Sequence, residues 1–313
     1  MMQSCKTVMY HYVRPINDSI FPKIKGLELE DFKKQINFLV KNYSFLNINQ
    51  ILKKIYENKD IPTNSIILTF DDGFKDHYDY VFPVLKKLKI QGVFFPPGEP
   101  IDKKIVLDVH KIHHILANCN NHKELVEIIL KNIKEAKKKF DLENPSDYYK
   151  RLAISNRFDD GDIIFIKRIL QKELPEKLRN EITDELFLKY VTGDEKEFSS
   201  KLYLSHEEIK EMVENGMEFG SHGYSHYWLS NLNESKLDIE LKKSEDFLRK
   251  FSKNSENWTF CYPYGDYNQK VISKIKNIGF KAGFTTKFSD TELIKEKRFE
   301  LNRFDTNDFK KPS

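Results

Sequence analysis

One short segment, residues 65–70 (SIILTF), limits the possible folds more than any other part of the chain. It is almost wholly apolar, which is typical of a parallel strand covered on both faces. Strand-like segments at 7–13 and 91–95 lie on either side, and apolar residues recur at helical spacing in 32–40 and 77–88. Strands separated by helices of this length predict βαβ units. We therefore expect an α/β protein built on a parallel sheet or barrel.

The alternation stops near residue 99 and resumes after Leu204. Between these points the apolar residues follow helical spacing, with almost no strand signal. Ser205 and Glu208 then fit a capping box at the start of a helix. Strands are expected at 217–220, 258–262, 282–285 and 301–304, and helices at 237–251 and 271–278. We predict that 1–98 and 201–313 form two parts of one domain and that 99–200 is a helical insertion.

Composition excludes several classes of protein. The 313 residues are 39% hydrophobic, which excludes wholesale disorder. No apolar run approaches the ~18 residues of a membrane helix, and the N-terminus shows no apolar signal-peptide core, so we expect a cytoplasmic protein. Three widely spaced cysteines suit a reduced compartment. A net charge of +4, from 52 basic and 48 acidic residues, is too even to indicate nucleic acid binding.

Two carboxylates, Asp71 and Asp72, directly follow the apolar strand, and Gly73 comes next. Adjacent carboxylates at the end of a buried strand are costly unless a cation lies beside them. Neighbouring side chains on an extended chain point in different directions, so one aspartate can bind a metal while the other faces a water molecule. Gly73 permits a sharp turn. The alternative is an ordinary turn that leads into a helix.

The same four letters, FDDG, recur at residues 158–161 and provide an internal comparison. The residues before this second copy do not resemble a buried strand, and a helix is expected directly after it. We therefore predict that Asp159 and Asp160 have turn and helix-capping roles.

Two further polar segments follow later strands. Residues 220–226 (GSHGYSH) carry His222 and His226, which can converge on one ion through a tight loop. A catalytic zinc site keeps only three protein ligands, so one aspartate with two histidines leaves room for water and substrate. Residues 260–266 (FCYPYGD) form a rigid turn that can aim a backbone N–H at a developing oxyanion. Each segment alone is a weak signal, since both patterns also occur without such a function.

Taken in order, LTFDDG, GSHGYSH and FCYPYG resemble the motifs of the polysaccharide deacetylase family, also called the NodB-homology or carbohydrate esterase family 4 fold. The resemblance covers the chain before Gly98 and after Leu204. It implies an incomplete (β/α)-barrel, seven-stranded and distorted relative to a TIM barrel, with the metal at its mouth. The helical insertion has no counterpart in this resemblance.

The resemblance also implies roles for individual residues. Asp71 corresponds to the general base, and the backbone N–H of Tyr264 corresponds to the donor that stabilises the oxyanion. The implied metal ligands are Asp72, His222 and His226. The implied ion is Zn²⁺, although members of the family also use other divalent ions.

The sequence departs from the family pattern at Cys261. Many members carry at this position an arginine that braces the catalytic aspartate. In lacking this arginine, the sequence resembles the branch of the family that carries YPYG, to which biofilm poly-N-acetylglucosamine deacetylases belong. Arg303 closes a later strand-like segment and is our candidate substitute, with a surface arginine as the alternative. We predict that Arg303 lies within about 2.7–3.2 Å of Asp71.

Many members also carry a late histidine as general acid, whereas no histidine follows His226 here. His11, near the end of the first strand, is our candidate for the acid, with a structural histidine as the alternative. His110 and His114 in the insertion are also four apart. Because no carboxylate at a strand end accompanies them, we expect them on a helix face, with a position over the site as the alternative.

These features predict a metal-dependent hydrolase that removes an N-acyl group, such as N-acetyl, from a sugar or a sugar-containing precursor. With no export signal, a nucleotide-linked or lipid-linked precursor of surface glycan fits better than a finished polymer. Two alternatives remain open. One is hydrolysis of a non-sugar amide or imide bond, because a fold does not fix the substrate. The other is a non-catalytic carbohydrate-binding member, which the missing arginine and late histidine would explain.

Overall fold

The computed structural model of the chain describes residues 4–156, 159–252 and 255–308. The chain divides into two compact units. The sheet unit contains Met1–Pro15, Gly26–Ile105 and Ser199–Ser313, and the helical unit contains Ile16–Lys25 and Val106–Phe198. The helical unit thus differs from the predicted insertion at 99–200, because it also includes a segment from near the N-terminus.

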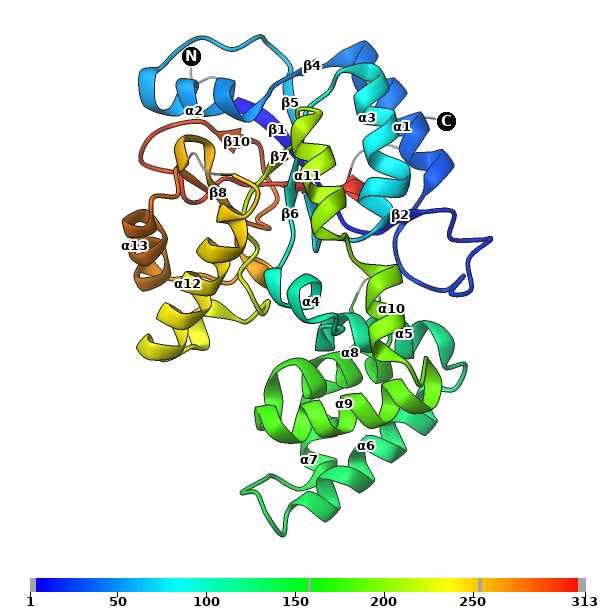
Figure 1. Cartoon of the computed structure of the whole chain (residues 1–313). Helices are drawn as coiled ribbons and strands as arrows, with labels where there is room; N and C mark the ends of the chain where they lie inside the picture. Colours follow the sequence, from blue (N-terminus) through cyan, green and yellow to red (C-terminus); the bar gives the residue numbers. More distant parts are fainter. Residues whose placement is uncertain (1–3, 157–158, 253–254, 309–313) are drawn as a thin grey trace. The chain divides into compact units, whose positions relative to one another are not determined.

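Parallel strands form the centre of the sheet unit (Figure 1). They pair in the order β1 (Ser4–Tyr10), β5 (Ser65–Asp71), β6 (Gly92–Phe95) and β7 (Glu218–Phe219). The shorter strands β4 (Ser44–Phe45), β11 (Phe304–Asp305) and β10 (Thr291–Glu292) extend this sheet, and β10 is antiparallel to β1. The chain therefore has an α/β fold with a mixed sheet. All seven residues of β5 are buried, as its apolar sequence predicted.

A second parallel pair, β8 (Thr259–Cys261) and β9 (Ala282–Phe284), adjoins these strands through single bridges. Ser221, just after β7, bridges to Phe260, and Phe284 bridges to Leu301. These pairings bring the ends of β5, β7 and β8 into one connected series of strands. The three polar segments that follow these strands therefore share one edge.

The first strand ends earlier than the sequence predicted. Residues 7–13 were expected to form it, whereas β1 ends at Tyr10 and the chain then forms β2 (Val13–Arg14), which pairs with β3 (Leu27–Glu28). The cause is the buried carboxylate of Asp76. It accepts hydrogen bonds from the Val13 backbone N–H at 3.2 Å and from Arg14 Nε at 2.7 Å, and so holds the chain away from the sheet.

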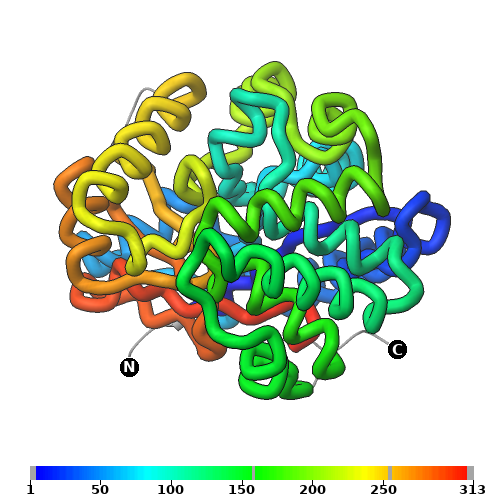
Figure 2. Tube along the Cα trace, turned by 90° about the horizontal axis from the view of Figure 1, so that it is seen from below, coloured from blue at the N-terminus to red at the C-terminus, as the bar shows by residue number. Residues whose placement is uncertain are grey.

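Helices surround the strands of the sheet unit. They are α1 (Leu29–Asn42), α2 (Ile48–Glu57), the π-helical turn η1 (His77–Val81), α3 (Phe82–Leu88), α4 (Gly98–Lys103), α11 (His206–Glu214), α12 (Glu234–Arg249) and α13 (Gln269–Ile278). Helices α12 and α13 lie side by side in both views (Figures 1 and 2). The predicted capping box is confirmed at α11, where Ser205 Oγ accepts the Glu208 N–H at 3.2 Å and Glu208 accepts the Ser205 N–H at 2.8 Å.

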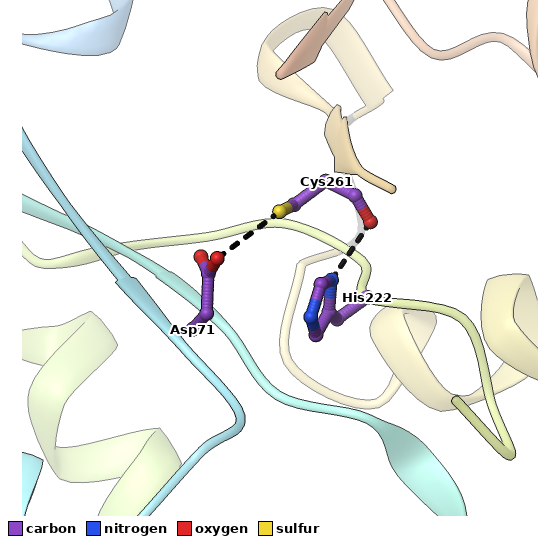
Figure 3. A group of neighbouring side chains, drawn as sticks. All are labelled: Asp71, His222 and Cys261. Carbon is purple, nitrogen blue, oxygen red and sulfur yellow. Dashed lines mark hydrogen bonds between the residues drawn. The ribbon is translucent and has the colours of Figure 1, made fainter. Parts of the chain in front are cut away.

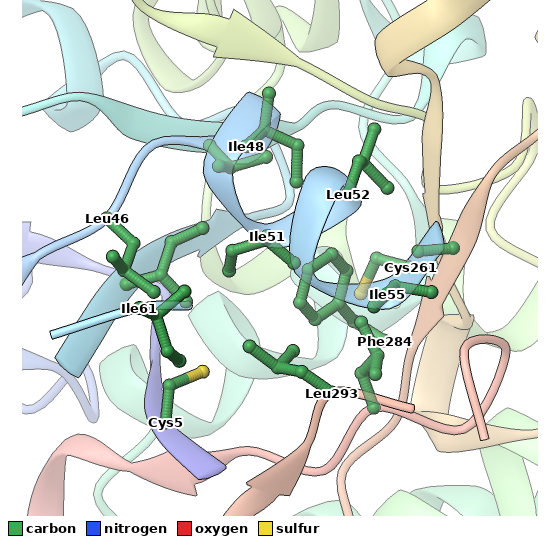
Figure 4. Close-up of a cluster of buried hydrophobic side chains, with 14 of the residues drawn as sticks. Cys5, Leu46, Ile48, Ile51, Leu52, Ile55, Ile61, Cys261, Phe284 and Leu293 are labelled. Atoms are coloured by element: carbon green, nitrogen blue, oxygen red, sulfur yellow. The ribbon is translucent and has the colours of Figure 1, made fainter. Parts of the chain in front are cut away.

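Two apolar layers fill the sheet unit. On one side, rings from four neighbouring strands stack in the order Tyr10, Phe70, Phe94 and Phe219, with centroid separations of 4.9, 4.7 and 5.4 Å. The other layer packs α2 against the strands and includes Ile51, Phe95, Cys261 and Phe284 (Figure 4). Each stacked pair contributes about 0.5–1.5 kcal/mol to stability in addition to the effect of its buried area. The stacking therefore helps to fix the ends of these strands.

The helical unit contains α5 (Asp108–Asn118), α6 (His122–Ala136), α7 (Pro145–Leu152), α8 (Gly161–Arg168), η2 (Ile169–Glu173), α9 (Glu176–Tyr190) and the first half of α10 (Glu195–Leu202). His110 and His114 lie on α5, where the His114 ring contacts Phe21 and Phe198. Among the helices that the structure describes, none combines the length and apolar character needed to span a membrane.

The second FDDG copy lies in the helical unit, although its Phe158 is outside the described residues. Asp160 is the N-cap of α8, and its side chain accepts the Ile163 N–H at 2.9 Å. Asp159 forms ion pairs with Lys25 and Lys167. The capping role predicted for Asp160 is therefore confirmed.

We expect Asp160→Ala to lower the free energy of unfolding by about 1 kcal/mol, because the Ile163 N–H loses its acceptor. Asp160→Asn retains an acceptor at the N-cap and serves as the control. Urea denaturation measures both effects. The same variants should leave the binding of divalent metal unchanged, and loss of metal in Asp160→Ala would show that this copy is part of the metal site.

Candidate active site

The two aspartates after β5 diverge because the backbone turns between them. Asp71 is the last residue of the extended strand, whereas Asp72 has a φ of +74° and Gly73 a φ of +62°. A Cβ atom at Gly73 would lie 2.6 Å from Cβ of Pro96, so this turn requires glycine. The neighbouring carboxylates therefore face different partners, as the sequence predicted.

Arg303 holds the carboxylate of Asp71 in a two-pronged ion pair. Its Nη1 and Nη2 donate to Oδ1 at 2.8 Å and to Oδ2 at 2.7 Å, while Nε donates to the carbonyl of Thr285 at 2.7 Å. Both side chains are buried, with Asp71 2% and Arg303 1% exposed. The contact expected between these residues is thus present, and Arg303 is not a surface arginine.

This ion pair keeps Asp71 ionised. Burial alone raises the pKa of a carboxyl group, but the charge and hydrogen bonds of Arg303 outweigh it and lower the pKa of Asp71 from 3.8 to about 2. Asp71 therefore carries a negative charge at every pH at which an enzyme ordinarily works. It is permanently available as a hydrogen-bond acceptor at the strand end.

Cys261 connects Asp71 to the histidine segment (Figure 3). Its thiol donates to Asp71 Oδ2 at 3.5 Å and accepts a hydrogen bond from Arg303 Nη2 at 3.1 Å. Its carbonyl lies 2.8 Å from Nδ1 of His222. A carbonyl only accepts, so Nδ1 carries a proton and Nε2 is the nitrogen that would be left to bind a metal ion. Sequence analysis missed this second role of Cys261, because a backbone carbonyl leaves no signal in the residue type.

Asp72, His222 and His226 converge on one point. His226 Nε2 lies 3.2 Å from His222 Nε2 and 3.3 Å from Asp72 Oδ1, and the third side of this triangle is 3.5 Å. Two imidazole nitrogens at this separation repel each other if both present lone pairs, unless a cation lies between them. Ligand atoms at about 2.0–2.2 Å from a tetrahedral zinc are about 3.3–3.6 Å apart. The three donors therefore fit a divalent metal ion.

A second group, formed by Asp71, His222 and Cys261, also brings three potential ligands together. Here the guanidinium of Arg303 already contacts both Asp71 and Cys261. A positive charge in that position disfavours a metal ion by direct repulsion. The group that contains Asp72 is therefore the better candidate metal site.

Tyr264 lies beside this site in a strained turn. Its φ is +59°, and His226 and Asp72 also have positive φ, at +58° and +74°. Such values cost side-chain-bearing residues free energy and often mark functional sites. The Tyr264 ring stacks on Trp228, with centroids 4.3 Å apart, and meets the His226 ring edge-on at 4.6 Å. The role predicted for its backbone N–H stays a prediction.

His11 also lies near Asp71. Its Nε2 is 3.9 Å from Asp71 Oδ2, and its side chain is 40% exposed. His77 is fully buried, and its Nε2 donates a hydrogen bond to the His11 carbonyl at 2.9 Å. This bond fixes the backbone at His11. Burial lowers the pKa of His77 to about 4, so its ring is neutral at ordinary pH. Sequence analysis did not single out His77, although it lies only six residues after Asp71.

The sequence model for polysaccharide deacetylases matches residues 58–283, most of the chain. The chain belongs to the polysaccharide deacetylase family. Over 106 residues it is 37% identical to the poly-beta-1,6-N-acetyl-D-glucosamine N-deacetylase of Staphylococcus aureus (strain MRSA252), a match that covers 30% of this chain and 36% of that protein. The Escherichia coli (strain K12) protein of the same name is 33% identical over 78 residues, covering 23% and 12%.

Solved structures share this fold. The Streptococcus pyogenes deacetylase PplD, in complex with acetate, has 17% sequence identity and a TM-score of 0.60, covering 97% of this chain and 93% of PplD. IcaB from Ammonifex degensii has 17% identity and a TM-score of 0.54, covering 96% and 90%. The matched segments of the curated relatives, in contrast, span about a third of their length or less.

We expect Arg303→Ala to move the acidic limb of the pH–rate profile to higher pH. Without the guanidinium, the effect of burial is opposed only by the weaker influence of His222 and His11, so the pKa of Asp71 rises and the carboxylate becomes available only at higher pH. Arg303→Lys should restore the profile only in part, since one ammonium cannot supply two parallel donors. Metal content should stay unchanged. An acidic limb at the wild-type pH in Arg303→Ala would contradict this role.

Proposed function

We propose that this chain is a divalent-metal-dependent hydrolase that removes an N-acyl group, N-acetyl in the first instance, from a sugar unit. The observation that carries this proposal is the convergence of Asp72 Oδ1 and the two histidine Nε2 atoms beside an ionised Asp71. We further propose that the bridged strands of the sheet unit correspond to the incomplete seven-stranded barrel of the family.

Asp72, His222 and His226 would hold the ion. The two nitrogen ligands and one carboxylate favour Zn²⁺ over Mg²⁺ or Ca²⁺, which prefer oxygen ligands. A divalent ion at this position supplies Lewis-acid polarisation of the acyl carbonyl and lowers the pKa of a nearby water. The remaining steps belong to the side chains and backbone of this chain.

Asp71 is the proposed general base. It accepts a proton from the attacking water as the oxygen forms a bond to the acyl carbon. Because its pKa is lowered to about 2, the carboxylate is ionised at ordinary pH and can therefore accept a proton. Arg303 orients Asp71 and keeps it ionised, through the pair of hydrogen bonds at 2.7 and 2.8 Å.

Tyr264 and His11 complete the proposed reaction. The backbone N–H of Tyr264 donates to the oxyanion that forms on the acyl oxygen. His11, close to Asp71 and partly exposed, protonates the nitrogen as the C–N bond breaks. The products are a free amine on the sugar and a carboxylate.

The proposed substrate class rests on the named relatives, which are deacetylases of poly-β-1,6-N-acetyl-D-glucosamine. An N-acetylated glucosamine unit in a glycan or a glycan precursor is therefore the first substrate to test, and surface glycan synthesis is the proposed context. The missing family arginine was one of the two reasons for considering a non-catalytic member. Arg303 removes this reason, because it supplies a guanidinium to both oxygens of Asp71.

We expect His222→Ala and Asp71→Asn to lose activity for different reasons. His222→Ala removes a metal ligand and should lose both zinc and turnover, whereas Asp71→Asn should keep zinc and lose turnover by at least about 100-fold. Zinc content is measured by atomic absorption, and turnover by amine release from N-acetylglucosamine oligomers and from a non-sugar acetamide.

Two matched controls accompany these variants. His206→Ala removes a histidine outside the site, and Asp160→Asn changes one aspartate of the second FDDG copy; both should behave as wild type. Zinc bound equally by wild type and His222→Ala would exclude the proposed ligand set. Release of amine only from the non-sugar acetamide would favour the alternative amide hydrolase.

A further inference from the structure

A buried carboxylate on α12 lies directly beneath the loop that carries both histidines. Glu240 is 3% exposed and lies on the same face of α12 as the apolar side chains of Leu237 and Leu241. A carboxylate on an apolar helix face is costly unless it is fully hydrogen-bonded. In the described part of the chain, the groups that donate hydrogen bonds to this carboxylate belong to Tyr224 and Ser225, and not to a lysine or arginine.

Glu240 binds the backbone of the loop between the histidines. Its Oε1 accepts the N–H of Tyr224 at 2.7 Å and the N–H of Ser225 at 2.8 Å. The preceding N–H, of Gly223, donates to Ser221 Oγ at 3.1 Å, and Ser221 Oγ contacts Ser244 Oγ, one turn along α12. Successive backbone N–H groups that face one side form a concavity for an anion, and here the anion is a side chain of the protein itself.

The loop conformation that Glu240 binds is one that the chain would not adopt by default. Gly223 has a φ of +71° and His226 a φ of +58°. A Cβ atom at Gly223 would lie 2.9 Å from Glu240 Oε1, so the loop and the carboxylate are in close contact. A positive φ is unfavourable for a residue with a side chain such as His226, so interactions of the neighbouring residues must stabilise this backbone conformation.

We propose that Glu240 is a positioning residue for metal binding, which fixes the loop so that Nε2 of His226 lies 3.2 Å from Nε2 of His222. His222 is held independently, by the Cys261 carbonyl. Glu240 therefore controls the second histidine relative to the first. This inference deepens the proposed function and rests on the metal site assigned there.

The test measures Zn²⁺ binding to the full chain by competition with a chromogenic chelator, together with the melting temperature of the metal-free protein. Glu240→Ala should weaken Zn²⁺ binding about 10–100-fold, the loss typical of residues that orient metal ligands from outside the coordination sphere. Glu240→Gln retains an acceptor oxygen and should lose less. Glu234→Gln, an exposed glutamate at the start of the same helix, is the matched control and should bind Zn²⁺ as wild type does.

A second variant keeps the test decisive if Glu240→Ala does not fold. Gly223→Ala leaves Glu240 in place but puts a methyl group against its carboxylate, and it should also weaken Zn²⁺ binding at least about tenfold. If Glu240→Ala lowers the melting temperature but binds Zn²⁺ as tightly as wild type, the residue is merely structural and the inference is wrong.

The proposed function and this inference fail in different ways. If wild type and His222→Ala bind Zn²⁺ equally, the ligand set is wrong and the role of Glu240 is wrong with it. If His222→Ala loses Zn²⁺ while Gly223→Ala and both Glu240 variants retain wild-type affinity, the metal site stands and only the role of Glu240 is overturned.

Discussion

The buried ion pair between Asp71 and Arg303 is the interaction that fixes the proposed base and joins the strand ends around it. Moving two charges out of water costs several kcal/mol per ion, and only close, fully hydrogen-bonded contact offsets it. Here Nη1 and Nη2 donate to both carboxylate oxygens, Nη1 also donates to Thr69 Oγ1 at 3.1 Å, and Nε donates to the Thr285 carbonyl. Asp71 and Thr69 lie on β5 and Thr285 directly follows β9, so the pair links two separate strands.

The small side chain of Cys261 allows this arrangement. It leaves the space beside Asp71 to a guanidinium that arrives from a different segment, and its thiol contacts both members of the pair. Its carbonyl meanwhile determines which nitrogen of His222 is protonated. One residue thus couples the proposed base to the proposed metal ligands, so that the two parts of the site are placed together.

Sequence analysis predicted the central strands of the sheet unit and the helices α1, α3, α11, α12 and α13, because the apolar spacing there is regular and the strands are buried on both faces. It did not predict α2 or the two-residue strands β4 and β10. It placed the end of β1 too late, because Asp76, 63 residues after Val13, decides where the chain leaves the sheet. It placed Ile16–Lys25 with the sheet domain, because packing on distant helices leaves no local signal. The contact of Arg303 with Asp71 was predictable only through the family resemblance. The burial of Glu240 could have been predicted, because its spacing places an acidic residue on the apolar face of a helix, four residues before the buried Ser244.

The most direct test of the account is a crystal structure of the wild-type protein with Zn²⁺, using anomalous scattering at the zinc absorption edge. We expect one strong peak, bonded to Asp72 Oδ1, His222 Nε2 and His226 Nε2, with Asp71 still paired with Arg303. A peak bonded to Cys261 Sγ and Asp71, or no peak among Asp72, His222 and His226 at saturating zinc, would contradict it.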